Sequence, residues 1–437
     1  MNNVRMWKGL FSKKHLSEHF QEKISPNNSV GLDKITVSKF NQNLNEELEI
    51  IERKVKGGTY KFTRFRQVLF LKGPNKEPRI ISIPTVRDKL VTSVLNEFFL
   101  NIYGEECLSP LPQIVIANIQ KEIPFYESFI KIDISKFYSS INHRKLLRII
   151  GRKIRKKEIK SLIQKAISTE TISLPIKEKK DIDKIKQGVP EGLPISNALA
   201  NIYLSDIDKK YRDDSRVKYY RYVDDILILT DYENLTDIKE TIYSDLKKLN
   251  LNVNKEKLAS DSTTCPFSFL GYYLCKSFTS VKRSSIYKLE DSIDQLLKQG
   301  KNNNHKYIEW RLNLKITGFI INEHKYGWLF FYSQITDTSI LHHLDWFTNK
   351  LLHRYGLYEE LHVKKFVRAF YEITKKLHST HYIPNMDNYS LEEKKQVLLE
   401  IYDEEVEDMS DTDIEYKFRK IMKREMQNIE KDVEHFS

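Results

Sequence analysis

The stretch VKYYRYVDDILIL, residues 217–229, constrains the fold of this chain more than any other. Its Val, Ile and Tyr residues favour two β-strands, and the carboxylates of Asp224 and Asp225 stand where the chain would turn between them. Aspartate is common in exposed turns, so a solvated hairpin is one reading. A functional site is the other, because adjacent carboxylates repel each other unless a cation neutralises them.

A second strand-like run, SFIKIDI at residues 128–134, carries another carboxylate. Its alternating isoleucines predict a half-buried strand with Asp133 on the opposite face. Further on, QGVPEGLPISNALANIYL, residues 187–204, predicts a Gly/Pro loop that enters a helix. A strand, a helix and a hairpin in this order can bring Asp133, Asp224 and Asp225 to one edge of a small antiparallel sheet.

Three converging carboxylates favour binding of Mg²⁺, since hard cations prefer oxygen ligands. Two such ions, roughly 3.5–4 Å apart, can activate an attacking hydroxyl and stabilise a leaving oxygen in phosphoryl transfer. We therefore expect Asp133, Asp224 and Asp225 to be metal ligands for two Mg²⁺ ions rather than turn residues.

Composition limits the class of protein. A chain of 437 residues predicts two to three structural units, and 40% hydrophobic with 30% charged residues indicates a globular protein. No apolar run approaches the ~20 residues of a membrane helix, and MNNVRMWKGLFSKKH at the start lacks the apolar core of a signal peptide. We expect a cytoplasmic protein with no membrane partner.

The charge of this chain indicates a polyanionic partner. The net charge is +12, from 72 Lys and Arg against 60 Asp and Glu. Six of these cations fall within residues 152–160, which we read as one helical stretch that could follow phosphates; a solvated surface helix is the alternative. The three cysteines show no CxxC spacing, so neither a disulfide framework nor a zinc module is indicated.

Several other elements are readable from the sequence. QVLFLKGPNKEPRIISIP, residues 67–84, and CPFSFLGYYL, residues 265–274, predict strand pairs, and residues 235–250 predict a helix. From about residue 281 the pattern is mainly helical. Two capping boxes support this near the end of the chain: Ser390 with Glu393, and Thr412 with Glu415.

Five motifs stand in the order in which reverse transcriptases carry theirs: KIDISKFYSSI at 131–141, GVPEGLPIS at 188–196, YVDD at 222–225, NKEK at 254–257 and FLG at 269–271. The chain resembles that family over roughly residues 30–275. IPTVRDKL at 83–90 and NSVGLDKI at 28–35 are similar to the bacterial branch that includes group II intron and retron enzymes. The resemblance implies an RNA-directed DNA polymerase that uses an RNA template and deoxynucleoside triphosphates.

The family pattern assigns catalytic roles to individual residues. It implies that Asp133 and Asp224 ligate the metal ions with Asp225 beside them, while a primer 3′-hydroxyl attacks the nucleotide and a DNA product grows. Lys72 and Arg79, on opposite arms of the predicted hairpin at 67–84, match residues that hold the triphosphate. Two exposed cations on a loop are the alternative.

Further roles follow from the same resemblance. Tyr138, five residues after Asp133, falls where the family carries an aromatic gate against a ribose 2′-hydroxyl, which favours DNA synthesis; a plain core tyrosine is the alternative. Lys257, with Asn254, matches the lysine that steadies the leaving pyrophosphate, or is an ordinary surface lysine. The primer grip, or else a core strand, corresponds to Phe269, Leu270 and Gly271.

One position departs from the family pattern. The family usually has Gln where this chain has Glu191, between Pro190 and Gly192. Both Glu191 and Gly192 are candidate nucleotide-binding residues. A carboxylate there could accept hydrogen bonds from the sugar but would repel phosphate.

The implied fold class is α+β, a right-hand polymerase with fingers, palm, thumb and a C-terminal helical extension. The expected domains are 1–127 for the N-terminal region and fingers, 128–280 for the palm with an inserted fingers segment at about 145–186, 281–360 for the helical thumb, and 361–437 for the extension.

The biological role is inferred by comparing signatures. The chain has no Cys/His pairs of a zinc endonuclease and no NAxxH or VTG signature of retrons. We therefore expect a defence-associated reverse transcriptase that copies a dedicated non-coding RNA against phage, with no particular oligomeric state indicated. The alternatives are a group II intron-type maturase or mobile-element enzyme, an RNA-binding scaffold with a vestigial polymerase site, and an RNA-directed RNA polymerase, which Tyr138 opposes.

Overall fold

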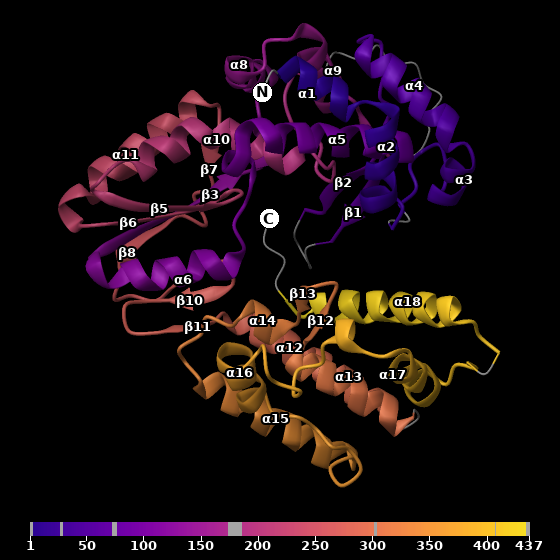
Figure 1. The fold of residues 1–437 in the computed structure, drawn as a ribbon. Coiled ribbons are helices and arrows are strands. Elements are labelled where there is room, and N and C mark those ends of the chain that lie inside the picture. Colours follow the sequence, from indigo (N-terminus) through magenta and orange to yellow (C-terminus); the bar gives the residue numbers. More distant parts are fainter. Residues whose placement is uncertain are drawn as a thin grey trace. The chain divides into compact units, whose positions relative to one another are not determined.

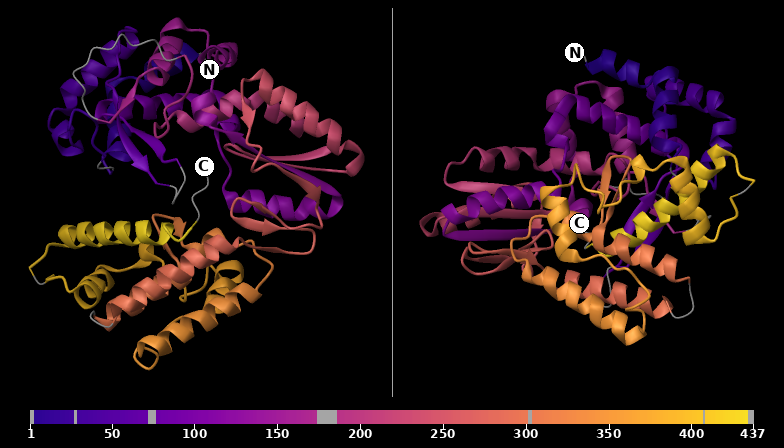
Figure 2. Two further views of the ribbon diagram at one scale, coloured as in Figure 1. Left: turned by 180° about the vertical axis from the view of Figure 1, so that it is seen from behind. Right: turned by 60° about the horizontal axis from the view of Figure 1, so that its bottom comes forward.

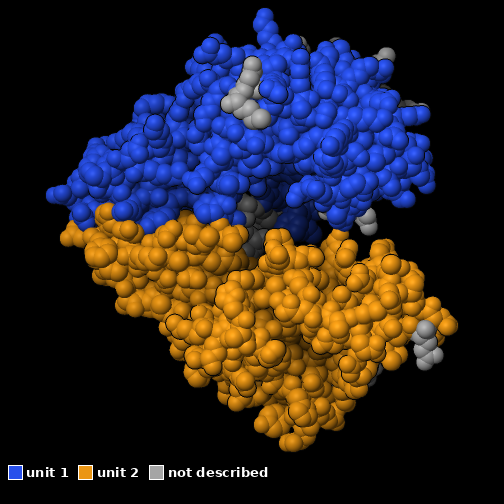
Figure 3. All heavy atoms as spheres, viewed as in Figure 1, with its two compact units in different colours: residues 1–110, 128–260 blue, residues 111–127, 261–437 orange. Residues whose placement is uncertain are grey.

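The structure, a computed structural model, describes residues 3–26, 29–71, 77–173, 186–300, 304–406 and 408–433. The chain forms two compact units, the first comprising residues 1–110 and 128–260 and the second residues 111–127 and 261–437 (Figure 3). Within the described residues, we find no helix that combines the length and the apolar character needed to span a bilayer.

A five-stranded sheet lies at one side of the first unit, at the left of Figure 1. Its main order is β5 (Val217–Tyr222), β6 (Asp225–Thr230), β3 (Ser128–Ser135) and β7 (Asn252–Val253), and β8 (Ala259–Ser262) also pairs with β3. The predicted half-buried strand is wrong in one respect. Side chains on both faces of β3 are buried, and Phe129 and Asp133, on the face predicted to be open, are only 2% and 6% exposed.

Two long helices pack on this sheet. These are α10 (Ser196–Arg212), which contacts β5, and α11 (Tyr232–Lys248), which contacts β3 (Figures 1 and 2). Both confirm helices expected from the sequence, and the apolar stripe of α10 is buried as its 3.6-residue period predicts.

A second, three-stranded sheet in the first unit has the order β2-β1-β4. The pair β1 (Phe65–Phe70) and β2 (Arg79–Ile83) is antiparallel and confirms the predicted hairpin, while β4 (Thr171–Ile172) runs parallel to β1. The other helices of this unit are α1 (Asn3–Leu10), α2 (Lys13–His19), a π-helix (Phe20–Ile24), α3 (Val37–Gln42), α4 (Leu44–Lys56), α5 (Val86–Tyr103), α7 (Phe137–Ser140), α8 (His143–Lys153) and α9 (Lys157–Ile167).

The basic stretch at 152–160 is not one helix, contrary to the prediction. The chain leaves the helix after α8 and re-enters one at α9, because Ile154 between them is extended and fully buried. Part of the positive charge there is already paired, since Arg152 lies 2.7 Å from Asp206 and Lys153 lies 2.8 Å from Glu106.

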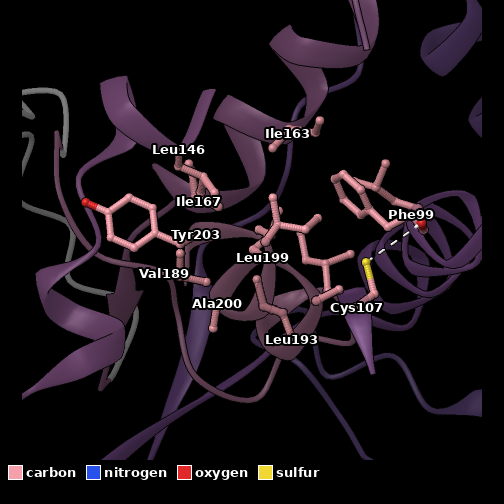
Figure 4. Close-up of a cluster of buried hydrophobic side chains, with 14 of the residues drawn as sticks. Phe99, Cys107, Leu146, Ile163, Ile167, Val189, Leu193, Leu199, Ala200 and Tyr203 are labelled. Carbon is pink, nitrogen blue, oxygen red and sulfur yellow. Dashed lines mark hydrogen bonds between the residues drawn. The ribbon is translucent and has the colours of Figure 1, made fainter. Parts of the chain in front are cut away.

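The core of the first unit anchors a loop that matters below. Figure 4 shows buried side chains from several helices packed around Leu199 and Ala200 of α10. Val189 and Leu193 belong to this cluster and are 3% and 4% exposed. The tripeptide between them, Pro190–Gly192, is therefore fixed at both ends by apolar burial.

The second unit contains a small antiparallel sheet, one helix that precedes it in the chain, and the helices that follow it. The strands are β9 (Phe267–Phe269), β10 (Tyr272–Leu274) and β11 (Thr279–Val281), which confirm the predicted strand pair and add a third strand. The helices are α6 (Pro112–Glu122), α12 (Arg283–Gln299), α13 (His305–Thr317), α14 (Trp328–Phe331), α15 (Ser339–Tyr355), α16 (Phe366–Lys375), α17 (Leu391–Gln396) and α18 (Asp411–Glu430), with a hairpin of β12 (Phe319–Ile321) and β13 (His324–Tyr326).

One of the two predicted capping boxes is confirmed. Ser390 and Glu393 hydrogen-bond reciprocally at the start of α17. The box of Thr412 with Glu415 is wrong, because Ser410 caps α18 by accepting a hydrogen bond from the Asp413 backbone N–H, so Thr412 already lies inside the helix.

Candidate active site

The YVDD sequence forms a two-residue turn. Tyr222 and Asp225 are paired at the ends of β5 and β6, so Val223 and Asp224 make the turn itself. Val223 has a left-handed backbone, with φ of 55°. For a β-branched residue such a conformation costs on the order of 1–3 kcal/mol, so neighbouring contacts must hold it in place.

A buried network around Arg221 supplies those contacts. The guanidinium donates a hydrogen bond of 3.0 Å to the Val223 carbonyl and another of 3.0 Å to the Asn201 side chain. It also pairs with Asp208, which accepts a 2.7 Å hydrogen bond from Nε. The Arg221 and Asp208 side chains are only 6% and 7% exposed. Arg221 thus links the carboxylate-bearing turn to helix α10.

Asp133 lies beside this turn on the neighbouring strand. Strands β3 and β6 are antiparallel with Asp133 directly opposite Asp225, and the Ile134 N–H donates a 3.0 Å hydrogen bond to the Asp224 carbonyl. The sheet therefore brings Asp133, Asp224 and Asp225 to one edge, as the order of the motifs predicts.

Burial and mutual repulsion act on these carboxylates. Burial raises the pKa of Asp224 and so does the charge of Asp133. Burial and the charge of Asp224 raise the pKa of Asp225 to about 7. A bound cation would relieve this repulsion, and three carboxylates offer only oxygen atoms, so the residues present suit a hard divalent ion.

Residues of the NKEK motif contact Asp133 directly. Asn254 donates to its carboxylate at 3.2 Å, and the Asn254 backbone N–H donates to the Asp133 carbonyl at 2.8 Å. The Lys257 ammonium lies 2.7 Å from Asp133 Oδ2. Although burial opposes it, this contact raises the pKa of Lys257, so the lysine is charged beside the carboxylates.

Tyr138 lies on the short helix α7, close to the carboxylates. It is 7% exposed, and its hydroxyl donates a hydrogen bond to the Asn197 side chain on α10. Burial raises the pKa of this hydroxyl, and the charges of Asp224 and Glu191 add to the effect. The Val189 N–H also donates a 2.8 Å hydrogen bond to the Tyr138 carbonyl, so Tyr138 lies against the loop that carries Glu191.

Glu191 forms an ion pair with Arg79 of β2, and both side chains are only partly exposed, at 25% and 20%. The loop lies against this strand, because the Ser82 N–H donates a 2.6 Å hydrogen bond to the Glu191 carbonyl. Gly192 permits this approach: its φ is 101°, and a Cβ there would lie 2.8 Å from both the Ile81 side chain and the Ser82 carbonyl.

The remaining predicted site residues are located elsewhere. Lys72 lies outside the described residues. Leu270 and Gly271 form a two-residue turn, with φ of 47° and 78°, between Phe269 and Tyr272. This hairpin belongs to the second unit, whereas the other described site residues belong to the first.

Sequence reasoning missed the residues that support the turn and the tyrosine. Asn201 and Asp208 are seven positions apart on α10 and so share a helix face, which is a readable signal in an otherwise apolar stripe. Arg221 directly precedes the YVDD sequence. Asn197 gives no comparable signal, because its partner Tyr138 is 59 residues away in the chain.

Comparison with known proteins bears directly on this site. Residues 71–274, which include both the carboxylates and the loop with Glu191, match the family model described as reverse transcriptase (RNA-dependent DNA polymerase).

Individual relatives cover only part of the chain. The group II intron-encoded protein LtrA of Lactococcus lactis subsp. cremoris is 27% identical over 172 residues, 38% of this chain and 28% of the relative. The putative COX1/OXI3 intron 1 protein of Saccharomyces cerevisiae is 26% identical over 289 residues, 52% of this chain and 34% of the relative. The chain thus spans about a third of these relatives or less. Among solved structures, apo telomerase from Candida tropicalis aligns with a TM-score of 0.44 and 14% identity, covering 80% of this chain and 70% of that one.

Proposed function

We propose that this chain, in which residues 71–274 are a reverse transcriptase domain with group II intron-encoded relatives, is an RNA-directed DNA polymerase. One observation carries the proposal: Asp133 lies directly opposite Asp225 on adjacent strands, with Asp224 in the turn beside them. We also propose that residues 1–127 form the N-terminal region and fingers, 128–280 the palm with an inserted fingers segment at about 145–186, 281–360 the thumb and 361–437 the C-terminal extension.

Asp133 and Asp224 would hold two Mg²⁺ ions, with Asp225 beside them. When bound, the ions would supply activation of the primer hydroxyl and neutralisation of charge on the phosphate. The raised pKa values of Asp224 and Asp225 support a cation at this position, because they reflect like charges held close together in a buried site.

Neighbouring side chains would bind and orient the nucleotide. Arg79 would release the Glu191 carboxylate and bind phosphate oxygens of the triphosphate instead. A guanidinium can make paired hydrogen bonds to a carboxylate or to a phosphate. Lys257 would leave Asp133 to steady or protonate the departing pyrophosphate. Its present 2.7 Å contact keeps that proton next to the reacting groups.

Tyr138 would exclude ribonucleotides by contact with the 2′-hydroxyl. Its burial and its hydrogen bond to Asn197 hold the ring in one orientation, as a steric gate requires. Extension of a DNA primer on an RNA template, with deoxyribonucleotides or ribonucleotides, tests this choice of substrate. We expect deoxyribonucleotide incorporation, and a higher ribonucleotide fraction in Tyr138→Ala but not in Tyr138→Phe, which keeps the ring.

Each other result favours a different function. Exclusive use of ribonucleotides would indicate an RNA polymerase. Absence of any extension would indicate an RNA-binding scaffold with a vestigial site. An unchanged nucleotide ratio in Tyr138→Ala would mean that the ring is only part of the core.

We propose that the template is one dedicated non-coding RNA, copied in the cytoplasm in defence against phage. The second unit offers a surface suited to RNA, because α16 buries Phe366 and Ala369 on one face while exposing Arg368 and Tyr371 on the other. Sequencing of RNA bound in cells should give one dominant species, and Asp224→Asn should raise phage plating.

A mobile-element enzyme is the second candidate, and the names of the relatives favour it, since these are intron-encoded proteins. A broad RNA population together with unchanged phage plating would support this candidate over the defence role.

A further inference from the structure

Two histidines and a glutamate meet in the first unit, on elements that carry none of the site residues above. His15 and His19 are four positions apart on α2, and Glu97 lies on α5. One carboxylate oxygen, Glu97 Oε2, is 2.9 Å from His15 Nε2 and 3.0 Å from His19 Nδ1. Histidines four residues apart face the same side of a helix, which is the spacing used by helical zinc ligands.

This cluster is compact enough to bind one ion. Among the described residues, it is the one group of three His, Cys, Asp or Glu side chains whose ligand atoms all lie within 4.8 Å of one another. The oxygen atoms of Asp133, Asp224 and Asp225 do not all lie within that distance of one another in this ion-free arrangement, in which Asp133 is hydrogen-bonded to Lys257 and Asn254. The two clusters also differ in chemistry, since only this one contains nitrogen donors.

A neighbouring side chain fixes the orientation of the buried histidine. His19 is 9% exposed, and its Nε2 lies 2.7 Å from the hydroxyl of Ser93, one turn before Glu97 on α5. A metal-binding histidine usually donates its second ring N–H to such an acceptor. If His19 Nε2 carries the hydrogen, the lone pair on His19 Nδ1 lies 3.0 Å from Glu97 Oε2. Both atoms are then hydrogen-bond acceptors, and this close approach needs a cation between them.

We propose that His15, His19 and Glu97 form a binding site for a divalent transition metal, with Zn²⁺ the best match to two imidazoles and one carboxylate. Three protein ligands leave the fourth tetrahedral position to water. The side chains of His15 and Glu97 are 29% and 31% exposed, so an ion can reach the site. The ion would clasp α2 onto α5 and stabilise the first unit.

Zn²⁺ binding to the full chain, without a histidine tag and in excess Mg²⁺ to occupy the carboxylate site, tests the proposal. Equilibrium dialysis with elemental analysis should give one tightly bound Zn²⁺ per chain. Glu97→Gln and His15→Gln should each weaken binding at least tenfold. Ser93→Ala should weaken it by roughly 10–100-fold, since loss of a supporting hydrogen bond misorients the ligand.

The chain offers a matched control. His305 and Glu360 form a His–Glu pair at 2.7 Å to which the described part of the chain adds no third ligand, so His305→Gln should leave Zn²⁺ binding unchanged. Zn²⁺ should also raise the melting temperature of the wild type and of His305→Gln, but not that of Glu97→Gln, because an ion bound only to the folded state stabilises it.

Two results would overturn the proposal. Failure of the wild type to bind micromolar Zn²⁺ would mean that the cluster is a hydrogen-bonded clasp, with both histidines donating to Glu97. Binding that persists in Glu97→Gln but is lost in Cys265→Ser would place the ion at the exposed thiol instead. Neither result depends on polymerase activity, so the proposed function is tested separately.

Discussion

Val223 combines a β-branched side chain with a left-handed backbone, which costs free energy at the point where the carboxylates must be held. Arg221 offsets that cost by donating to the Val223 carbonyl while pairing with Asp208. Because the pair is buried, removing one partner leaves the other charge without compensation. The turn that carries Asp224 therefore depends on a buried salt bridge between two residues outside the three carboxylates.

Replacing Arg221 with Met tests this dependence. We expect a loss of roughly 3–5 kcal/mol in the free energy of unfolding, because Asp208 remains buried without its partner. Chemical denaturation measures the change. Arg152→Met is the control: its pair with Asp206 is exposed at 57% and 55%, so the loss should be at most about 1 kcal/mol. Equal losses in the two variants would contradict the role of Arg221.

Glu191 forms an ion pair with the guanidinium of Arg79, the group that we propose binds the triphosphate. Glu191→Gln removes the charge that competes with phosphate for Arg79, so we expect a lower apparent KM for deoxynucleotides. Steady-state extension at varied nucleotide concentration measures it. Glu170→Gln is the control, since Glu170 pairs with Arg64 at 3.2 Å, a pair to which we assign no role in the site. An unchanged KM in Glu191→Gln would mean that the ion pair persists or lies away from the nucleotide.

At the scale of elements, the site depends on close backbone approaches. The loop of residues 189–193 is anchored by buried residues at both ends and hydrogen-bonded to β2 through the Glu191 carbonyl. Gly192 lies where this loop meets the strand, with no room for a side chain. The position of Glu191 beside Arg79 thus follows from packing of the loop on the strand.

Gly192→Ala should displace this loop. The new Cβ would lie 2.8 Å from the Ser82 carbonyl, and φ of 101° is strained for alanine. We expect loss of both stability and nucleotide binding, measured by thermal melting and by KM. Gly151→Ala is the control, because Gly151 lies in α8 and the added Cβ would meet nothing within 4 Å beyond the neighbouring backbone of its own helix. It should stabilise the helix by roughly 0.5–1 kcal/mol. A neutral Gly192→Ala would contradict the tight approach.

Helices and strands could be predicted from the sequence more fully than side-chain contacts between residues far apart in the chain. Strand alternation and motif order were enough to predict that Asp133 would meet Asp224 and Asp225, because sheet pairing follows from local patterns. The Arg79–Glu191 pair joins residues 112 positions apart, and no local pattern encodes it. The same holds for Glu97 and the histidines of α2. The break after α8 was missed because burial of Ile154 overrides the helical propensity of its basic neighbours.

At the scale of the whole molecule, the chain divides into two compact units. The first carries the three carboxylates, the tyrosine and the loop with Glu191, which lie within the reverse transcriptase match. In the second, buried ion pairs of Arg311 with Glu425 and Lys315 with Asp432 join α13 to the C-terminal region. The metal-binding carboxylates of the chemistry that we propose all belong to the first unit. Replacing one of these carboxylates therefore tests the proposal most directly.

Extension of a primer on an RNA template by Asp224→Asn, compared with Asp206→Asn, tests the central claim. Both changes remove one carboxylate from the first unit, but Asp206 is exposed on α10. We predict that Asp224→Asn loses several orders of magnitude in rate while Asp206→Asn keeps its activity. Because burial raises the pKa of Asp224, its ionised form destabilises the fold, so Asp224→Asn should melt at the wild-type temperature or above in metal-free buffer. Undiminished extension by a well-folded Asp224→Asn would contradict the account.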